Sequence, residues 1–377
     1  MHFDAIVVGL GAMGSAALYQ LGRRDQRVLG LEAFAAGHRL GSSHGESRVI
    51  RLAYYEHPNY VPLLHRAYQL WADLERDSGE HLLRLTGGLM IGAPDSALVS
   101  GAKASAEQHQ LAYELLDSDE VRRRHPALHV QPGEVALFEP RAGILSPEAC
   151  VAAHVRLAEA AGAHVRYAEP LRSWTAGEHG VEVVTNQGRY SADQVVFTSG
   201  AYMSQVLGDE RVQVRAERIP LFWLQPSAPE LFELGRLPIY LWQQADGDHF
   251  YGFPHLQWPG AKVARHHSRD YCDPDTVDRQ VNAEDERRLR AVIEHRLPAL
   301  NGPVQSSLIC LYENSPDEHF LIDRLPGQPN VVFAGGFSGH GFKFASVVGE
   351  ALADLVIDGR ATPDADFLKL RVRPLRS

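Results

Sequence analysis

The chain has 377 residues, of which 45% are hydrophobic and 22% charged, enough apolar material for two domains or for one large two-part unit. Its formal net charge of -10 repels polyphosphate and argues against nucleic acid as a partner, while local basic sites for a small anion are compatible with it. Three scattered cysteines, a start without the pattern of a signal peptide and the lack of a membrane-length apolar run lead us to expect a reduced, cytoplasmic protein with no metal site and no membrane partner.

Residues 3–32 have the pattern of a βαβ unit. The run "FDAIVVG" predicts a buried strand, "AMGSAALYQLGRR" a short helix and "RVLGLE" a second strand. Gly9, Gly11 and Gly14 have the G-x-G-x-x-G spacing that allows a tight turn, close approach to a pyrophosphate and close helix packing. Glu32 ends the second strand, where a carboxylate can accept hydrogen bonds from a ribose. The unit predicts a dinucleotide site but does not distinguish FAD from NAD, and the alternative is a glycine-rich turn without a ligand.

Stretches in the middle of the chain predict a second domain. "GGLMIGAP" at 87–94, "FYGFPHL" at 250–256 and "AKVARHH" at 261–267 read as strands, and we expect a largely antiparallel sheet that covers the cofactor. After them, "NAEDERRLRAVIEHRL" predicts a surface helix with Asn282 as its N-cap and three acidic residues in its first turn.

Two later segments predict further parts of the first domain. Residues 194–204 read as a buried strand that ends in a glycine turn, and residues 330–357 as a strand, a glycine-rich loop and an amphipathic helix. The fold class is therefore mixed α/β, with a discontinuous Rossmann-like domain. We expect that domain to contain residues 1–85, 146–215 and 318–377, and the substrate domain to contain residues 86–145 and 216–317.

Four motifs occur together along the chain: "GSSHGESRVIRLAY", "YGFP" followed by Lys262 and His266, "CLYENSPDEHFLID" and "GFSGHGFKFASVVGE". On these motifs the chain resembles the monomeric sarcosine oxidase and N-methyltryptophan oxidase family of flavoproteins over essentially its whole length. The resemblance makes the Rossmann-like domain an FAD-binding domain. It implies a monomer that oxidises an N-methyl amino acid and passes the electrons to dioxygen, giving hydrogen peroxide and an imine that hydrolyses to amino acid and formaldehyde.

The resemblance implies a covalent bond between the flavin 8α-methyl carbon and the sulfur of Cys310. A thiolate is a natural nucleophile for that carbon, whereas an isolated cysteine such as Cys150 or Cys272 is by default a small buried apolar residue. The residues expected to bind the cofactor are Gly9, Gly11, Gly14, Glu32, Ser42, His44, Cys310, Gly339, Gly341 and Phe342.

Catalytic roles follow from the same resemblance. Arg48 is expected against the flavin face opposite the substrate, and Lys262 is expected to activate dioxygen through its ammonium charge. Alternation along "AKVARH" puts Lys262 and His266 on one face of a strand, and His266 and Tyr251 are expected to line the substrate side. A lysine on a strand is more commonly exposed, so the resemblance carries the assignment of Lys262.

Arg51 and Lys343 are the expected partners of the substrate carboxylate, because a carboxylate stripped of water needs charge-assisted donors. Lys343 stands at the opening of the C-terminal helix, whose N-terminal dipole would face the flavin ring. Tyr312 is expected to be an aromatic residue of the pocket, although core packing explains an aromatic there equally well. His340 is given a supporting role.

Several positions depart from the family pattern and leave the substrate open. Tyr55 and His57 stand where glycines are expected, Tyr202 stands where tryptophan is usual, and Trp242 lies in a stretch expected to border the pocket. Bulk at Tyr55 or Trp242 could shrink the site toward sarcosine or provide stacking for a larger aromatic amine. The alternatives are an oxidase of N-methyltryptophan, of a cyclic or D-amino acid or of glycine, a flavin dehydrogenase that delivers electrons to quinone, and a nucleotide-binding module without enzymatic activity.

Overall fold

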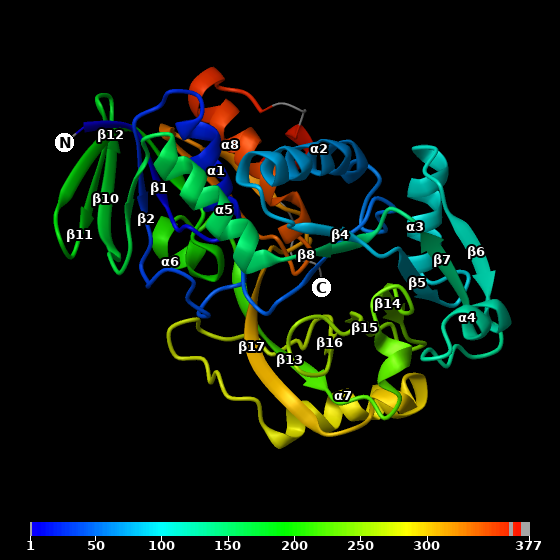
Figure 1. The fold of residues 1–377 in the computed structure, drawn as a ribbon. Coiled ribbons are helices and arrows are strands. Elements are labelled where there is room, and N and C mark those ends of the chain that lie inside the picture. The colour runs from blue at the N-terminus through cyan, green and yellow to red at the C-terminus, as the bar shows by residue number, and fades with distance from the viewer. Residues whose placement is uncertain (1, 362–364, 371–377) are drawn as a thin grey trace.

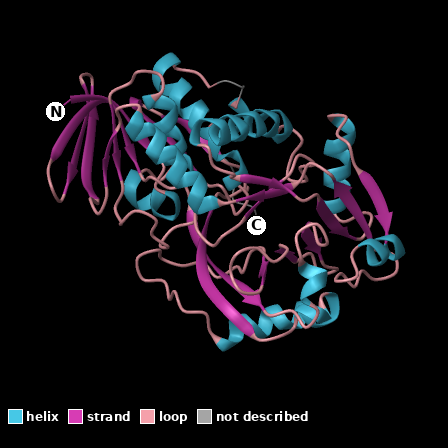
Figure 2. Ribbon diagram, in the orientation of Figure 1, coloured by secondary structure: helices cyan, strands magenta, loops and turns pink. Residues whose placement is uncertain are grey.

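Two large sheets and one small sheet organise residues 2–361 and 365–370, the part of the chain that the computed structural model describes (Figure 1). Figure 2 shows the helices gathered on one side of the first large sheet and at the outer side of the second. A mixed α/β fold with a parallel and an antiparallel sheet was predicted from the sequence and is confirmed.

The first sheet has the order β10-β11-β12-β1-β2-β9, with β19 paired to β12 and β18 paired to β19. The strands β12, β1, β2, β9 and β19 are parallel, whereas β10, β11 and β18 are antiparallel to their neighbours. Their bounds are β1 His2–Val8, β2 Val28–Leu31, β9 His164–Arg166, β10 Leu171–Gly177, β11 Gly180–Thr185, β12 Arg189–Phe197, β18 Leu321–Leu325 and β19 Gln328–Gly335.

Both faces of the parallel part of this sheet are buried. Val7 of β1, Val196 of β12 and Val332 of β19 pack under the helices, while the next residues along these strands belong to a second core cluster on the opposite face. Burial on both faces explains why the strands read as continuous apolar runs and not as alternating ones. The covering helices are α1 Ala12–Gly22, α2 Tyr60–Ser78, α5 Pro147–Ala160 and α8 Ala345–Asp358 (Figure 1).

The second sheet has the order β17-β13-β16-β15-β14-β5-β7-β6, and its pairs are antiparallel except β14 with β5. Its strands are β5 Gly88–Gly92, β6 Glu114–Asp117, β7 Val135–Glu139, β13 Arg215–Leu224, β14 Ile239–Gln243, β15 His249–Gly252, β16 Ala261–Arg265 and β17 Val304–Asn314. Helix α7 Ala283–Arg296 covers one face through Leu289, Val292 and Ile293. The predicted cap of this helix is confirmed, because Asn282 accepts from the amides of Glu284 and Asp285.

Short elements connect the two sheets. The small sheet β3-β8-β4 joins Arg48–Ile50, Gly143–Leu145 and Leu83–Leu85. The remaining helices are α3 Ala97–Gln108, α4 Ser118–Arg124 and α6 Met203–Leu207, and the 3₁₀ turns are η1 Gly200–Tyr202, η2 Pro229–Phe232, η3 Pro298–Leu300, η4 Phe342–Phe344 and η5 Asp366–Leu368. In the described part of the chain, no helix combines the length and the apolar character needed to cross a bilayer.

The predicted elements appear at the predicted places, with two differences in length. The strand expected over 250–256 ends at Gly252, and the C-terminal helix begins at Ala345, so Lys343 lies in the preceding turn η4. The two large sheets take their strands from alternating parts of the chain. The strands of the first sheet lie between residues 2 and 335 with long interruptions, and those of the second lie between residues 88 and 314. The domain boundaries drawn from the sequence stay a prediction.

Candidate active site

The turn between β1 and α1 can be built only with glycine. Gly9 has a φ of +92°, and a Cβ atom there would lie 2.7 Å from the carbonyl oxygen of Thr198. A Cβ atom at Gly14 would lie 1.8 Å from the carbonyl oxygen of Gly9, whereas one at Gly11 would only approach the hydroxyl of Ser43 at 3.3 Å. The N-terminus of α1 lines the cavity in front of the turn, where the amide of Ala12 donates to the Ser43 hydroxyl at 3.0 Å, and a helix N-terminus in this position suits anion binding.

Changing Gly14 to alanine is expected to lower the thermal unfolding midpoint, because the new methyl group must displace the backbone of Gly9, at a cost of about 1–3 kcal/mol or more. Gly22 on the same helix is the matched control. A Cβ atom there meets its first neighbour at an ordinary 3.6 Å, so Gly22→Ala should gain about 0.5–1 kcal/mol from helix propensity. Equal midpoints for the two variants in a thermal melt would contradict this account of the turn.

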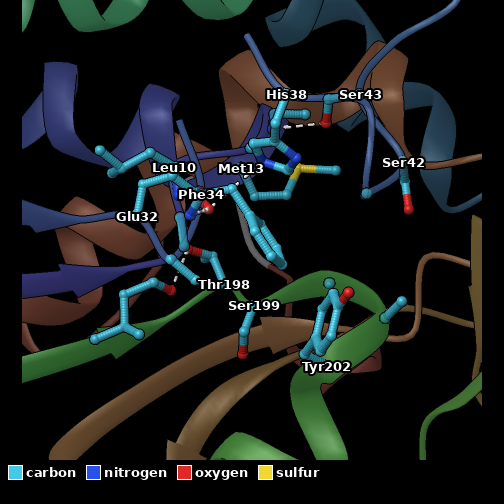
Figure 3. Close-up of a pocket in the computed structure, with 18 of the residues that line it drawn as sticks. Leu10, Met13, Glu32, Phe34, His38, Ser42, Ser43, Thr198, Ser199 and Tyr202 are labelled. Atoms are coloured by element: carbon cyan, nitrogen blue, oxygen red, sulfur yellow. Dashed lines mark hydrogen bonds and ion pairs between the residues drawn. The ribbon is translucent and has the colours of Figure 1, made fainter. Parts of the chain in front are cut away.

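Glu32 closes the far side of the turn. Its carboxylate accepts hydrogen bonds from the amides of Leu10 at 2.8 Å and Phe34 at 3.1 Å, and His38 Nε2 lies 3.4 Å from it. Figure 3 shows these side chains beside Thr198, whose hydroxyl donates to the carbonyl oxygen of Gly9 at 2.8 Å, with Ser199 and Tyr202 farther along the lining of the cavity.

The cavity has a volume of about 990 Å³, at the upper end of the range for ligand pockets. It runs from the glycine turn to the loop before α8. Nine residues that the sequence predicted for the site line it, namely Gly9, Gly11, Glu32, Ser42, Arg48, Tyr312, Gly339, Gly341 and Phe342. The other predicted residues do not line the cavity. Most of them lie behind the end of the cavity that Arg48 and Tyr312 line.

Arg48 stands between the cavity and Cys310. Its guanidinium donates to the carbonyl oxygens of Ser42 at 2.7 Å and Ser47 at 2.8 Å, and its Nη2 lies 3.5 Å from Cys310 Sγ. The guanidinium carbon lies 6.0 Å from the ring centroid of Phe342. The cysteine is buried, and a positive charge beside the sulfur is the environment in which cysteines become reactive.

Lys262 is buried under the loop that carries Arg48. Its Nζ donates to the carbonyl oxygens of Gly45 at 2.6 Å and Ser47 at 3.0 Å and to the Ser47 hydroxyl at 3.2 Å. Burial, reinforced by the charge of Arg48, holds the pKa of this lysine well below its usual value. The ammonium form is therefore costly here unless negative charge is brought close to it.

Two carboxylates that the sequence analysis missed hold this loop in place. Glu46, at a φ of +70°, accepts from the amides of Gln257 and Trp258 at 2.8 and 2.6 Å and from the indole of Trp223 at 2.7 Å. Glu148 of α5 accepts from the amides of Gly45 at 2.6 Å and Glu46 at 3.2 Å. These contacts join residues far apart in the sequence, so a single sequence carries no signal for them.

His266, Tyr251 and Tyr312 lie together, as predicted. His266 Nδ1 lies 3.2 Å from the hydroxyl of Tyr312, and the ring of Tyr251 stands at 81° to that of His266 with centroids 6.2 Å apart. Burial, followed by the charge of His267, holds the pKa of His266 well below its usual value, so the ring is neutral. A Cβ atom at Gly339 would lie 2.3 Å from Tyr312, so the glycine makes room for the tyrosine ring.

Arg51 is buried and already holds a carboxylate, that of Glu56. Its Nη2 donates to both carboxylate oxygens at 2.8 Å, and its Nη1 donates to the carbonyl oxygen of Ala53 at 2.8 Å. The rings of Tyr54 and Tyr55 lie on it at 4.5 and 4.9 Å from its guanidinium carbon. Glu56 was not predicted, although an acid five residues after a candidate anion-binding arginine was a usable signal.

Lys343 lies next to this pair, with its Nζ 5.1 Å from the ring centroid of Tyr54 and bonded to the carbonyl oxygen of His340 at 2.6 Å. Burial, then the charge of Arg51, lowers the pKa of Lys343 to about 7. His340 is bonded to the Tyr54 hydroxyl at 2.6 Å and lies 2.9 Å from the carbonyl oxygen of Glu318, in agreement with a supporting role.

Among the residues that depart from the family pattern, Trp242 does not border the site, and that expectation is wrong. Alternation along β14 points its ring to the face covered by α7, where it stacks on Phe250 at 5.5 Å and contacts Arg296. Tyr55 does lie at the site, stacked on His249 at 5.9 Å. Tyr202 lines the cavity opposite Phe34, with ring centroids 5.8 Å apart (Figure 3).

The chain is similar in sequence and in fold to known proteins. The family model described as FAD dependent oxidoreductase matches residues 4–355. A monomeric sarcosine oxidase of Streptomyces avermitilis is 45% identical over 361 residues, which cover 95% of this chain and 94% of that protein. An N-methyl-L-tryptophan oxidase of Yersinia pestis is 34% identical, with 94% of each chain covered. The solved structure of NikD, an unusual amino acid oxidase essential for nikkomycin biosynthesis, has the same fold, with a TM-score of 0.88, 24% identity and coverage of 100% of this chain and 99% of that one.

Proposed function

The chain belongs to the family of FAD-dependent oxidoreductases that includes the monomeric sarcosine oxidases, and from this premise we propose that it oxidises N-methyl amino acids of the sarcosine class. The observation that carries the proposal is the pair of buried cations, Arg51 and Lys343, that lie against the ring of Tyr54. Arg51 holds the Glu56 carboxylate through one nitrogen, Nη2, which donates to both oxygens at 2.8 Å, and an amino acid carboxylate would find the same charge-assisted donor. A substrate with a carboxylate and a small amine fits such an anchor.

The residues of the cavity fit FAD. Gly9 and Gly14 leave no room for a side chain, and Glu32 follows β2. Two residues that line the cavity carry a buried polar atom without a hydrogen-bond partner in the described part of the chain, Ser42 Oγ and Glu313 Oε2, and His44 Nδ1 is a third such atom outside the lining. We propose that Gly9, Gly11, Gly14 and Glu32 bind the nucleotide part. Ser42, His44, Gly339, Gly341 and Phe342 would hold the flavin part, with Cys310 as its covalent anchor.

Acid precipitation tests the covalent bond. We expect the yellow colour to stay with the denatured protein, because a thioether to Cys310 survives unfolding, and we expect Cys310→Ser to release the colour into the supernatant. The matched control is Cys150→Ser, which changes a buried cysteine of α5 that does not line the cavity and should leave the colour with the pellet. Colour in the supernatant of the unmodified protein would remove the thioether and leave FAD bound by contacts alone.

When bound, FAD accepts the electrons of the substrate and delivers them to dioxygen, giving hydrogen peroxide. Arg51 and Lys343 bind the substrate carboxylate, and Tyr251, His266 and Tyr312 surround the amine end. Arg48 would lie against the flavin face opposite the substrate, and Lys262 would supply positive charge beside the reacting dioxygen.

No side chain has to act as a general base in this scheme. The amine can bind deprotonated, because burial and the charges of Arg51 and Lys343 disfavour an ammonium ion in the same pocket. His266 is neutral and is placed to accept or donate a hydrogen bond through its contact with Tyr312. Hydrolysis of the imine product would give the amino acid and formaldehyde, and we propose that the enzyme works as a monomer.

Anaerobic addition of sarcosine, and separately of N-methyltryptophan, to the purified protein tests the function through the flavin absorbance. Bleaching by sarcosine supports the proposal, and bleaching by N-methyltryptophan alone would assign the stack of Tyr55 and His249 to a larger aromatic amine. N-methylethanolamine, which lacks the carboxylate, is the control and should not bleach the flavin. Bleaching only by glycine or a D-amino acid would overturn the N-methyl specificity while leaving an FAD-dependent amine oxidase.

A further inference from the structure

Glu313 is a buried carboxylic acid that none of the roles above explains. The residue is 7% exposed and lines the cavity, and its Oε2 lacks a hydrogen-bond partner in the described part of the chain. A Cβ atom at Gly200 would lie 3.9 Å from this oxygen, which places it at the turn η1. The residues just before η1, Thr198 and Ser199, pack against Gly9 of the nucleotide turn.

The position of Glu313 on β17 turns it toward the nucleotide and away from the substrate. Successive residues of a strand point to opposite faces. Cys310 packs with Leu221 and Ala264, on the face where Lys262 lies, whereas Leu311 packs with Ala201 of η1. Glu313 shares the face of Leu311 and lines the cavity together with it.

Within residues 2–361 and 365–370, no cationic side chain forms an ion pair with the carboxyl group of Glu313. Burial raises the pKa of Glu313 to about 8, and the amide of Gly336, which favours the ionised form, offsets only part of that effect. The charged and titratable side chains on the elements around it are Arg215, Glu217 and Arg218 of β13, Tyr202 of η1, Tyr312 of β17 and His340 after the 336–339 loop. Arg215 lies over the ring of Tyr271, Arg218 pairs with Asp285, and Glu217 is bound by His267 and Asn314. At neutral pH the carboxyl group keeps its proton and can donate a hydrogen bond.

We propose that the Glu313 carboxyl group donates a hydrogen bond to an oxygen of the bound flavin nucleotide. The cavity between the glycine turn and the flavin end receives the part of FAD that is richest in acceptors, the ribityl hydroxyls and the phosphates. A donor without a partner at this place would meet such an oxygen, and a carboxylate would repel the phosphates. The inference concerns cofactor binding and does not depend on which amine is oxidised.

The pH dependence of flavin retention follows from this arrangement. Below the pKa of Glu313 the protonated group binds the nucleotide, and as the pH rises through that value the group ionises and becomes a repulsive neighbour of the phosphates. Retention should therefore weaken on the alkaline side only. If Glu313 served only the fold, its ionisation would change the stability of the protein and would leave flavin retention unchanged.

The rate of FAD release, followed by flavin fluorescence between pH 6 and about 9.5, tests the proposal. The measurement uses Cys310→Ser protein, so that retention depends on non-covalent contacts. We compare Glu313 with E313Q, which keeps size and an N–H donor without a charge, and with E313L, which removes the hydrogen bond. The control E350Q alters a carboxylate that pairs with Arg66 outside the cavity.

With Glu313 in place, release should accelerate about ten-fold across the upper half of this range, whereas E313Q should give a flat profile. E313L should release FAD about five-fold faster than E313Q at every pH, the size expected of one hydrogen bond. An identical pH course in E313Q, or retention by E313L equal to that of E313Q, would overturn the proposal. If E313L does not fold, the comparison of Glu313 with E313Q decides alone.

Discussion

Changing Lys262 to methionine is expected to slow the reaction of the reduced enzyme with dioxygen about 10²–10³-fold and to leave reduction by the substrate nearly unchanged. Methionine fills most of the space of the lysine stem but removes its amino group from beneath the loop. The three oxygens that bind Nζ, two from Ser47 and one from Gly45, would lose a donor. Stopped-flow mixing, first with substrate under anaerobic conditions and then with oxygenated buffer, separates the two half-reactions.

The control for this prediction is Lys103→Met on α3, a half-exposed lysine outside the site that should change neither half-reaction. The pH profile gives a second readout. Since burial drives Lys262 toward its neutral form, the reaction with dioxygen should slow as the pH rises, and the methionine variant should lose that dependence. Equal losses in both half-reactions would show that Lys262 supports the fold of the loop and has no special role toward dioxygen.

Changing Arg51 to methionine should lower kcat/KM for an N-methyl amino acid about 10²–10³-fold, mainly through a higher KM. The guanidinium donates to a carboxylate through Nη2, and charge-assisted hydrogen bonds contribute about 1.5–3 kcal/mol each. Steady-state kinetics with the substrate and with its analogue lacking the carboxylate measures the effect. The poor activity with that analogue should be the same in Arg51→Met and in the unmodified enzyme.

Glu56 provides the companion variant. Glu56→Gln removes the negative charge that Arg51 binds in this structure and keeps the size of the side chain. A substrate carboxylate that displaces Glu56 from Arg51 should then bind more tightly, and KM should fall. The same anchor predicts a pH effect through Lys343, whose pKa is about 7: its ammonium is lost as the pH rises through that value, and the carboxylate then binds less tightly. A KM that is unchanged in Arg51→Met would move the carboxylate site elsewhere in the pocket.

The nucleotide turn could be predicted because its information is local. The glycine spacing, the flanking strands and Glu32 all lie within one βαβ unit, and Gly9 and Gly14 are required by contacts with Thr198 and with each other. Three of the eight strands of the second sheet, β5, β15 and β16, were also predicted, since their composition and their turn residues are local signals. Boundaries were less accurate where a turn, such as η4, precedes a helix.

The remainder depended on contacts between distant segments. Trp242 was placed at the pocket from its position in the sequence, but the pairing of β14 with β5 and β15 decides which face its side chain takes, and that face belongs to α7. Glu46, Glu148 and Glu313 look like ordinary acidic residues in the sequence. The burial of Glu313 and the backbone amides bound by Glu46 and Glu148 arise from contacts between segments that are far apart in the sequence.

Strand β17 restricts how this protein can change its length in evolution or by design. Its 11 residues pair with β13, and they separate Cys310 and Tyr312 on one face from Leu311 and Glu313 on the other (Figure 1). Inserting or deleting a single residue before Cys310 would exchange the two faces, turning the cysteine toward the nucleotide and the carboxyl group toward the substrate. Tolerated insertions in this strand should therefore come in pairs of residues or be absorbed by a bulge, and length variation among relatives should concentrate in the loop before Val304.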